Sequence, residues 1–115
     1  MRLLQDPVIG SVPGQIAPAY RAAVDWTNTT ANSQMAIIWW RLLALTGEEK
    51  WKDAALKANQ FNRSLQDIDH ANHGRRGGVR GSFPGHKGYG KFWYMNWTMK
   101  FYIDGLLAEL GVEVK

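Results

Sequence analysis

Residues 69–91, DHANHGRRGGVRGSFPGHKGYGK, combine cations, imidazoles and glycines in a way that could bind an anion. The segment has seven glycines, and its five Lys and Arg side chains against one Asp give a charge of +4, equal to that of the whole chain. Backbone N–H groups of glycine turns and the guanidinium groups of Arg75, Arg76 and Arg80 could hold a phosphate, sulfate or uronate. The alternative is a solvated loop whose glycines only serve turns. The chain has no GxxxxGK[ST] motif, so we do not expect a P-loop.

Acids and histidines gather at the start of the same segment, in the stretch DIDHANH. Asp67, Asp69, His70 and His73 are residue types that ligate metals, but their spacing matches no recognised site, so we expect no metal. Glycoside hydrolysis generally needs two carboxyl groups about 5–10 Å apart. Asp67, Asp69 and His70 are therefore the candidates for acid–base catalysis, with helix termination and solvation of the turn as the alternative.

Two further acids have expected structural roles. Asp25 aligns with Asn96 in a repeat described below, and an acid that alternates with an amide is better suited to capping a helix than to catalysis. Asp104 is expected to pair with Lys100, four residues earlier on a helix.

Aromatic side chains gather near the ends of the glycine-rich segments, where they could stack on sugar rings or nucleobases, or form core. Combining them with the basic loop, we expect a ligand to lie near five residues: Arg80, Ser82, His86, Tyr89 and Trp93. The other aromatic residues in these regions are Trp26, Phe92, Tyr94 and Trp97.

Hydrophobic periodicity predicts three helices, at about 27–45, 48–68 and 97–110, in a single domain of residues 1–115. The first two are separated by Thr46-Gly47 and should form an antiparallel hairpin, with Gly47 ending the first and a Thr46–Glu49 capping box starting the second. Polar residues such as Asn59 are expected on the solvent face of the second helix, and Asn96 is expected to cap the third. The predicted fold class is all-α, with long glycine-rich loops between the helices.

An internal repeat links the two loops. VIGSVPG at 8–14 and VRGSFPG at 79–85 lie 71 positions apart, and the same offset aligns Trp26-Thr27 with Trp97-Thr98. Each loop therefore precedes a helix start at the same distance, and the two loops should lie at the same end of the molecule. Repeating units of this kind need neighbours to cover their apolar faces.

The segments GGVRGSFPGHKGYGKFWYMNWTMKFYIDGLLAEL and ANSQMAIIWWRLLALTGEEKWKDAALK resemble the repeating unit of bacterial (α/α)-toroid proteins, a six-hairpin group with glycoside hydrolases, polysaccharide lyases and terpenoid cyclase-like folds. The resemblance covers about residues 8–110, or one and a half repeats. It implies a partial α/α toroid that binds carbohydrate or assists its processing, without a complete catalytic centre of its own.

Two other functions stay open. The chain could be a polysaccharide lyase or glycoside hydrolase completed by oligomerisation, or a basic protein that binds nucleic acid or an acidic partner. We expect a homo-oligomer, because uncovered apolar helix faces normally find partners, with carbohydrate or an anion as ligand, nucleic acid less favoured, and no cofactor. The chain has no cysteine, no signal-peptide pattern and no apolar run long enough to span a membrane, so a cytoplasmic location is expected.

Overall fold

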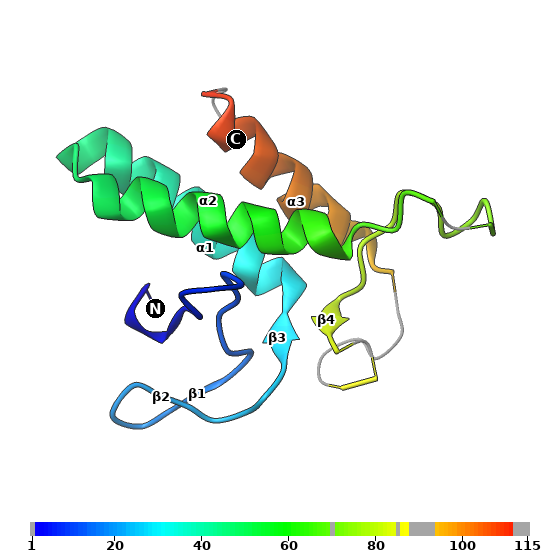
Figure 1. Ribbon diagram of the computed structural model, residues 1–115, viewed down its shortest axis with the longest axis horizontal. Helices are drawn as coiled ribbons and strands as arrows, with labels where there is room; N and C mark the ends of the chain where they lie inside the picture. The colour runs from blue at the N-terminus through cyan, green and yellow to red at the C-terminus, as the bar shows by residue number, and fades with distance from the viewer. Residues whose placement is uncertain (1, 70, 85, 88–93, 112–115) are drawn as a thin grey trace.

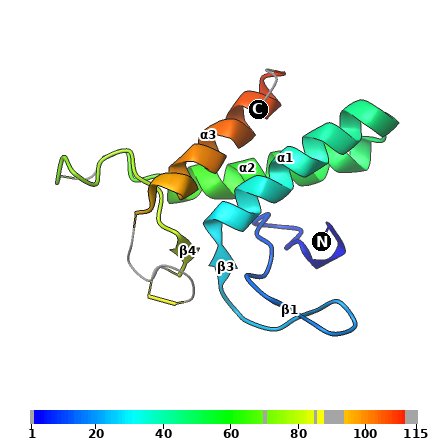
Figure 2. The same cartoon turned by 180° about the vertical axis from the view of Figure 1, so that it is seen from behind.

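The computed structural model describes residues 2–69, 71–84, 86–87 and 94–111. Its three α-helices are α1 (Thr29–Thr46), α2 (Glu49–Leu65) and α3 (Asn96–Glu109), and a short 3-10 helix, η1 (Arg2–Leu4), opens the chain. Helices α1 and α2 form a hairpin, and α3 crosses α1 at an angle (Figures 1 and 2).

The expectation of an all-α fold is wrong, because the described residues also form two small antiparallel sheets. In the first, β1 (Ile16–Ala17) pairs with β2 (Arg21–Ala22) across a tight turn. In the second, β3 (Thr27–Asn28) pairs with β4 (Ser82–Phe83), with Asn28 opposite Ser82. Strands of two residues are too short to show an alternating pattern, so periodicity could not predict them.

The β3–β4 sheet gives the internal repeat a structural meaning. The Ser82-Phe83 pair of the second loop lies beside the Thr27-Asn28 pair that directly precedes α1, and the N–H of Thr29 donates to the carbonyl of Gly81 at 2.9 Å. The loop of one unit is therefore hydrogen-bonded to the helix start of the other unit.

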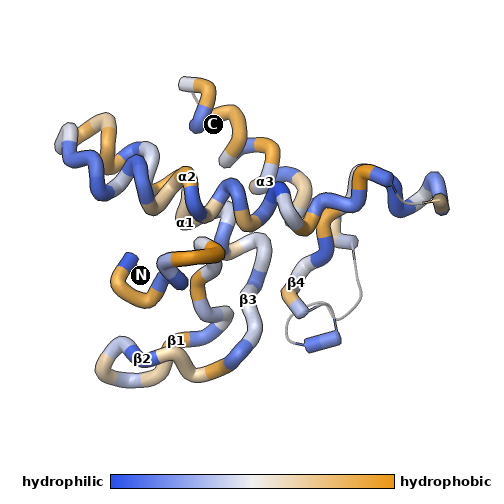
Figure 3. The backbone as a smooth tube through the Cα atoms, viewed as in Figure 1, coloured by the Kyte–Doolittle hydropathy of each residue, from blue (hydrophilic) through white to orange (hydrophobic). Residues whose placement is uncertain are grey.

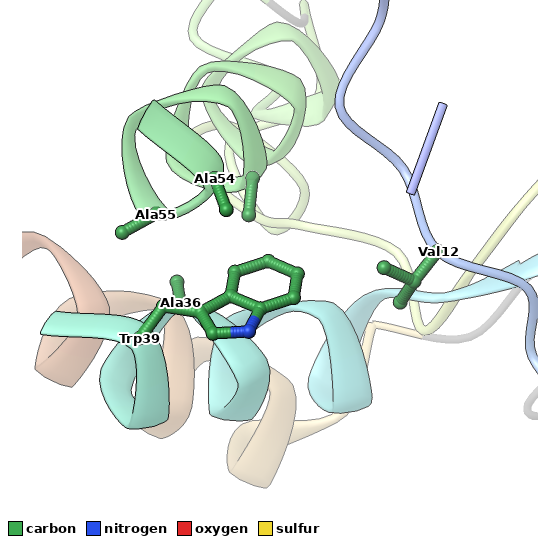
Figure 4. Close-up of a cluster of buried hydrophobic side chains, with 6 residues drawn as sticks. Val12, Ala36, Trp39, Ala54 and Ala55 are labelled. Carbon is green, nitrogen blue, oxygen red and sulfur yellow. The ribbon is translucent and has the colours of Figure 1, made fainter. Parts of the chain in front are cut away.

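The hydrophobic core lies between α1 and α2. Trp39 of α1 is 1% exposed and lies against small residues of α2 and against Val12 of the N-terminal segment (Figure 4). Alanines at the contact let the two helix backbones approach closely, and the remaining space is filled by the indole ring. The core cluster consists of Val12, Ala36, Trp39, Ala54, Ala55 and Ala58.

A buried polar network runs beside this core. Asn32 of α1 donates from Nδ2 to Oδ1 of Asn62 at 3.0 Å, and its own Oδ1 accepts from the N–H of Val12 at 3.1 Å. Asn62 donates to Oγ of Ser33 at 2.9 Å, and Asn59 donates to the carbonyl of Gly105 in α3 at 3.0 Å. The three asparagines have no exposed surface, so the expectation of a solvent-facing Asn59 is wrong.

The structure confirms only one of the three helix-end signals predicted from the sequence at Gly47, Thr46 and Asn96. Gly47 ends α1 in the left-handed conformation, as predicted, with φ of 72°. Thr46 makes no capping box, because the N-cap of α2 is Glu48 and has no side-chain cap bond. Asn96 is the first residue of α3 rather than its cap, which is Met95.

Candidate functional site

The chain leaves α2 through a narrow hairpin that carries the basic segment. Gln66 bridges Val79 across this hairpin, and the N–H of Asp67 donates to the carbonyl of Gly78 at 2.9 Å. The N–H of Gly77 donates back to the carbonyl of Asp67 at 2.6 Å, and Gly77 has φ of 86°, which favours glycine. These bonds fix Asp67 and the residues after Gly77 side by side at the base of the loop.

Tyr94 packs on this hairpin directly over Gly78. A Cβ atom at position 78 would lie 2.5 Å from Cδ1 of Tyr94, so the ring approaches the backbone as closely as only glycine allows. The hydroxyl of Tyr94 donates to Oδ2 of Asp67 at 3.2 Å and accepts from Nε of Arg80 at 3.3 Å. Tyr94 therefore links the two strands of the hairpin to the segment that leads into α3.

Two guanidinium groups lie on the same tyrosine ring. Cζ of Arg80 is 5.3 Å from the ring centroid of Tyr94, and Cζ of Arg75 is 5.8 Å from it, both within cation–π range. We call Asp67, Arg75, Arg80 and Tyr94 the Tyr94 cluster. Arg75 is exposed, and the other three residues are partly buried. A partly buried site with two guanidinium groups is suited to an oxyanion, because each group offers several N–H donors in one plane.

Ser82, one of the expected ligand residues, is buried and hydrogen-bonded within the protein, so its side chain is not accessible to a ligand. It is 2% exposed, and its Oγ donates to the carbonyl of Lys87 at 2.5 Å. Lys87 in turn donates from Nζ to Oδ2 of Asp25 at 2.6 Å. This hydrogen bond and the charge of Lys87 hold the pKa of Asp25 below its usual range. The expectation that Asp25 caps a helix is wrong, because Asn28 caps α1 by accepting from the N–H of Ala31.

The remaining expected site residues are not brought to one place. His86 and Asp69 are both exposed. Asp69 was expected to act in catalysis together with Asp67, but only Asp67 belongs to the Tyr94 cluster. His70, Tyr89 and Trp93 lie outside the described residues. The predicted ion pair between Lys100 and Asp104 is present on α3. Within the described part of the chain, no three Asp, Glu or His side chains gather as a metal site would require.

The two repeated loops meet over α2. Val8 and Ile9 from the first loop and Phe83 from the second line the same cavity of about 410 Å³, together with Phe61 of α2. The rings of Phe61 and Phe83 are in an edge-to-face arrangement with centroids 5.7 Å apart. Both loops lie on the same side of the helical hairpin (Figure 1).

Arg75 and Tyr94 were not among the five expected ligand residues. Both belonged to groups visible in the sequence, the basic loop and the aromatic residues, but nothing there distinguished Tyr94 from its neighbours. The available signal was Gly78, since a glycine inside a hairpin often marks the close approach of another group.

Comparisons with known proteins add no relative. No family model matches the chain, and neither the curated proteins nor the solved structures include a match to it. None of the described helices has the length and apolar character that crossing a lipid bilayer requires.

Proposed function

We propose that this protein binds a negatively charged carbohydrate, bearing uronate or sulfate groups, at the Tyr94 cluster. The observation that carries the proposal is the convergence of Arg75 and Arg80 on one tyrosine at the base of the basic loop. Guanidinium groups bind carboxylates and sulfates through paired N–H donors, and these hydrogen bonds are stronger than those between neutral groups.

The other two members of the cluster suit a sugar better than a bare anion. The carboxylate of Asp67 can accept hydrogen bonds from sugar hydroxyl groups, and the hydroxyl of Tyr94 stands between that carboxylate and Arg80. An anionic group would lie on the arginine side, away from Asp67, with hydroxyl groups of the same sugar reaching toward the Asp67 carboxylate. The resemblance of residues 77–110 to carbohydrate-processing repeat proteins also favours a sugar ligand.

We assign binding rather than hydrolysis to this site. Asp67 is the one carboxylate among the four defined members, and glycoside hydrolysis generally uses two. The chemistry of the cluster is therefore sufficient for recognition, and the proposal includes no bond cleavage.

The test is isothermal titration calorimetry with an oligogalacturonate, with a sulfated oligosaccharide and with a neutral malto-oligosaccharide of equal length. At least one of the two charged oligomers should bind, and the neutral one should bind much more weakly. Arg80→Gln should lower the affinity about 10- to 100-fold, because a hydrogen bond to a charged group contributes about 1.5–3 kcal/mol and 1.4 kcal/mol is tenfold. Tyr94→Phe keeps the ring but removes the hydroxyl link, and it should cost less than Arg80→Gln.

Arg21→Gln is the matched control, because it removes the same charge from the exposed strand β2. Equal losses for Arg21→Gln and Arg80→Gln would show only general charge attraction, and absence of binding to both uronate and sulfated oligomers would refute the proposal. Tighter binding of a single-stranded oligonucleotide would favour a basic nucleic-acid-binding protein instead.

A further inference from the structure

One side of α3 is apolar and uncovered within the described part of the chain. Ile103 is 46% exposed and Leu110 is 77% exposed, with Leu107 partly buried between them. Leu110 directly follows the last residue of α3 and keeps a right-handed helical backbone, so these residues, at steps of four and three, form a stripe along one side of the helix. Apolar positions continue along the C-terminal half of α3 (Figure 3), whose opposite side contacts α2 through Gly105 and Glu109.

The internal repeat identifies what this stripe corresponds to in the first unit. At the offset of 71, Ile103, Leu107 and Leu110 align with residues 32, 36 and 39 of α1. Those residues are Asn32, Ala36 and Trp39, all at most 1% exposed, and they lie in the interface with α2. In the first unit a second helix covers this face, whereas the stripe on α3 has no such cover among the described residues.

We propose that a second copy of this chain covers the stripe, with the two α3 helices packed antiparallel about a two-fold axis. A second copy offers no spare helix of the α2 type, because the small apolar residues of α2, Ala54, Ala55 and Ala58, are already buried against its own α1. Its own α3 stripe is equally apolar and equally uncovered. A two-fold interface needs a surface that matches itself, and an apolar helix stripe satisfies this condition.

The charges around the stripe favour the antiparallel arrangement. In this arrangement Ile103 of each copy meets Leu110 of the other, and the two Leu107 side chains lie near the axis. Lys100, one turn before Ile103, then lies near the C-terminal end of the other α3, where the helix dipole is negative. A parallel pair would bring the two Lys100 side chains together. This proposal is independent of the carbohydrate site, because none of the four residues of the Tyr94 cluster belongs to the stripe.

The test is solution mass by light scattering over a range of protein concentrations. We expect twice the chain mass of 13.0 kDa for the wild type. Ile103→Glu should weaken the dimer on the order of 100-fold, because it places an unpaired charge in an apolar interface. Ile68→Glu is the matched control, since Ile68 is 64% exposed and lies outside the stripe, and it should leave the dimer intact.

Cysteine cross-linking keeps the proposal testable if the Ile103→Glu variant fails to fold. The chain has no cysteine, so Leu107→Cys supplies the one thiol, and oxidation should produce a covalent dimer through the axis. Ile68→Cys should still associate but should form no covalent dimer under the same oxidation, because Ile68 lies outside the stripe. A wild-type monomer at all concentrations, a dimer that Ile103→Glu leaves unchanged, or equal cross-linking by both cysteine variants would each overturn the proposal.

Discussion

Replacing Asn32 by leucine should destabilise the protein, although the position is completely buried and leucine is apolar and of similar size. Asn32 connects three segments, because it accepts from the N–H of Val12 and donates both to Oδ1 of Asn62 and to the carbonyl of Ala58. Leucine would leave the N–H of Val12 and Oδ1 of Asn62 buried without these partners. If burial of apolar surface alone decided stability, the same change would be favourable.

The expected size of the effect follows from these two terms. Each buried polar group that loses its partner costs about 1–3 kcal/mol. Burying the leucine side chain returns about 2 kcal/mol. Taking the middle of the first range for two groups, the net loss for Asn32→Leu is about 2 kcal/mol.

Urea unfolding at a fixed protein concentration measures this loss. With a slope of about 2 kcal/mol per molar, the midpoint should fall by about 1 M. Gln34→Leu is the matched control, since Gln34 is an exposed residue of the same helix and its replacement should change the stability by less than about 0.5 kcal/mol. A leucine variant as stable as the wild type, or a control with an equal loss, would refute the reasoning.

Two further predictions concern the loops. Gly10→Ala should lower the melting temperature more than Gly77→Ala, although both glycines have φ of 86°. A Cβ atom at position 10 would lie 2.2 Å from the carbonyl oxygen of Lys57, whereas a Cβ atom at position 77 would meet no atom within 4 Å. Thermal unfolding of the two variants measures the difference. Lys87→Gln should raise the pKa of Asp25 toward its ordinary value, as measured by NMR titration of the carboxyl group, because the hydrogen bond to Lys87 is the main cause of its lowered pKa. A carboxyl pKa that is lower in the folded than in the unfolded state contributes stability above the unfolded-state value, and this contribution is lost as the pH falls through the folded-state value. An unchanged pKa in the variant would contradict the assigned cause.

The helices were predictable because their apolar residues recur with helical spacing. The structure places them at 29–46, 49–65 and 96–109, within three residues of each predicted boundary. The caps were harder, because a cap depends on where the chain turns rather than on residue type alone. Asp25 and Asn28 are both good capping residues, and in the structure it is Asn28 that accepts from the N–H of Ala31 and also pairs with Ser82 in the small sheet.

The buried polar network was not predictable from the hydrophobic pattern. Asn59 and Asn62 stand among charged residues of α2, where polarity indicates solvent exposure. They are buried because α3 and the N-terminal part of α1 lie against that face, a contact between segments far apart in the chain. The Tyr94 cluster was not predictable for the same reason, because the hydroxyl of Tyr94 donates to Asp67, which lies 27 positions earlier in the chain. The repeat was visible in the sequence, but only the structure shows that one unit's loop pairs with the other unit's helix start.

The most direct test of the proposed carbohydrate site is an NMR titration of the ¹⁵N-labelled protein with an oligogalacturonate. We predict that the largest amide shifts occur at Asp67, Arg75, Gly78, Arg80 and Tyr94, and that the Arg80→Gln variant needs at least about tenfold more ligand to reach the same shifts. Largest shifts at the apolar cavity between Ile9 and Phe83, or no saturable shifts at any residue, would contradict a binding site at the Tyr94 cluster.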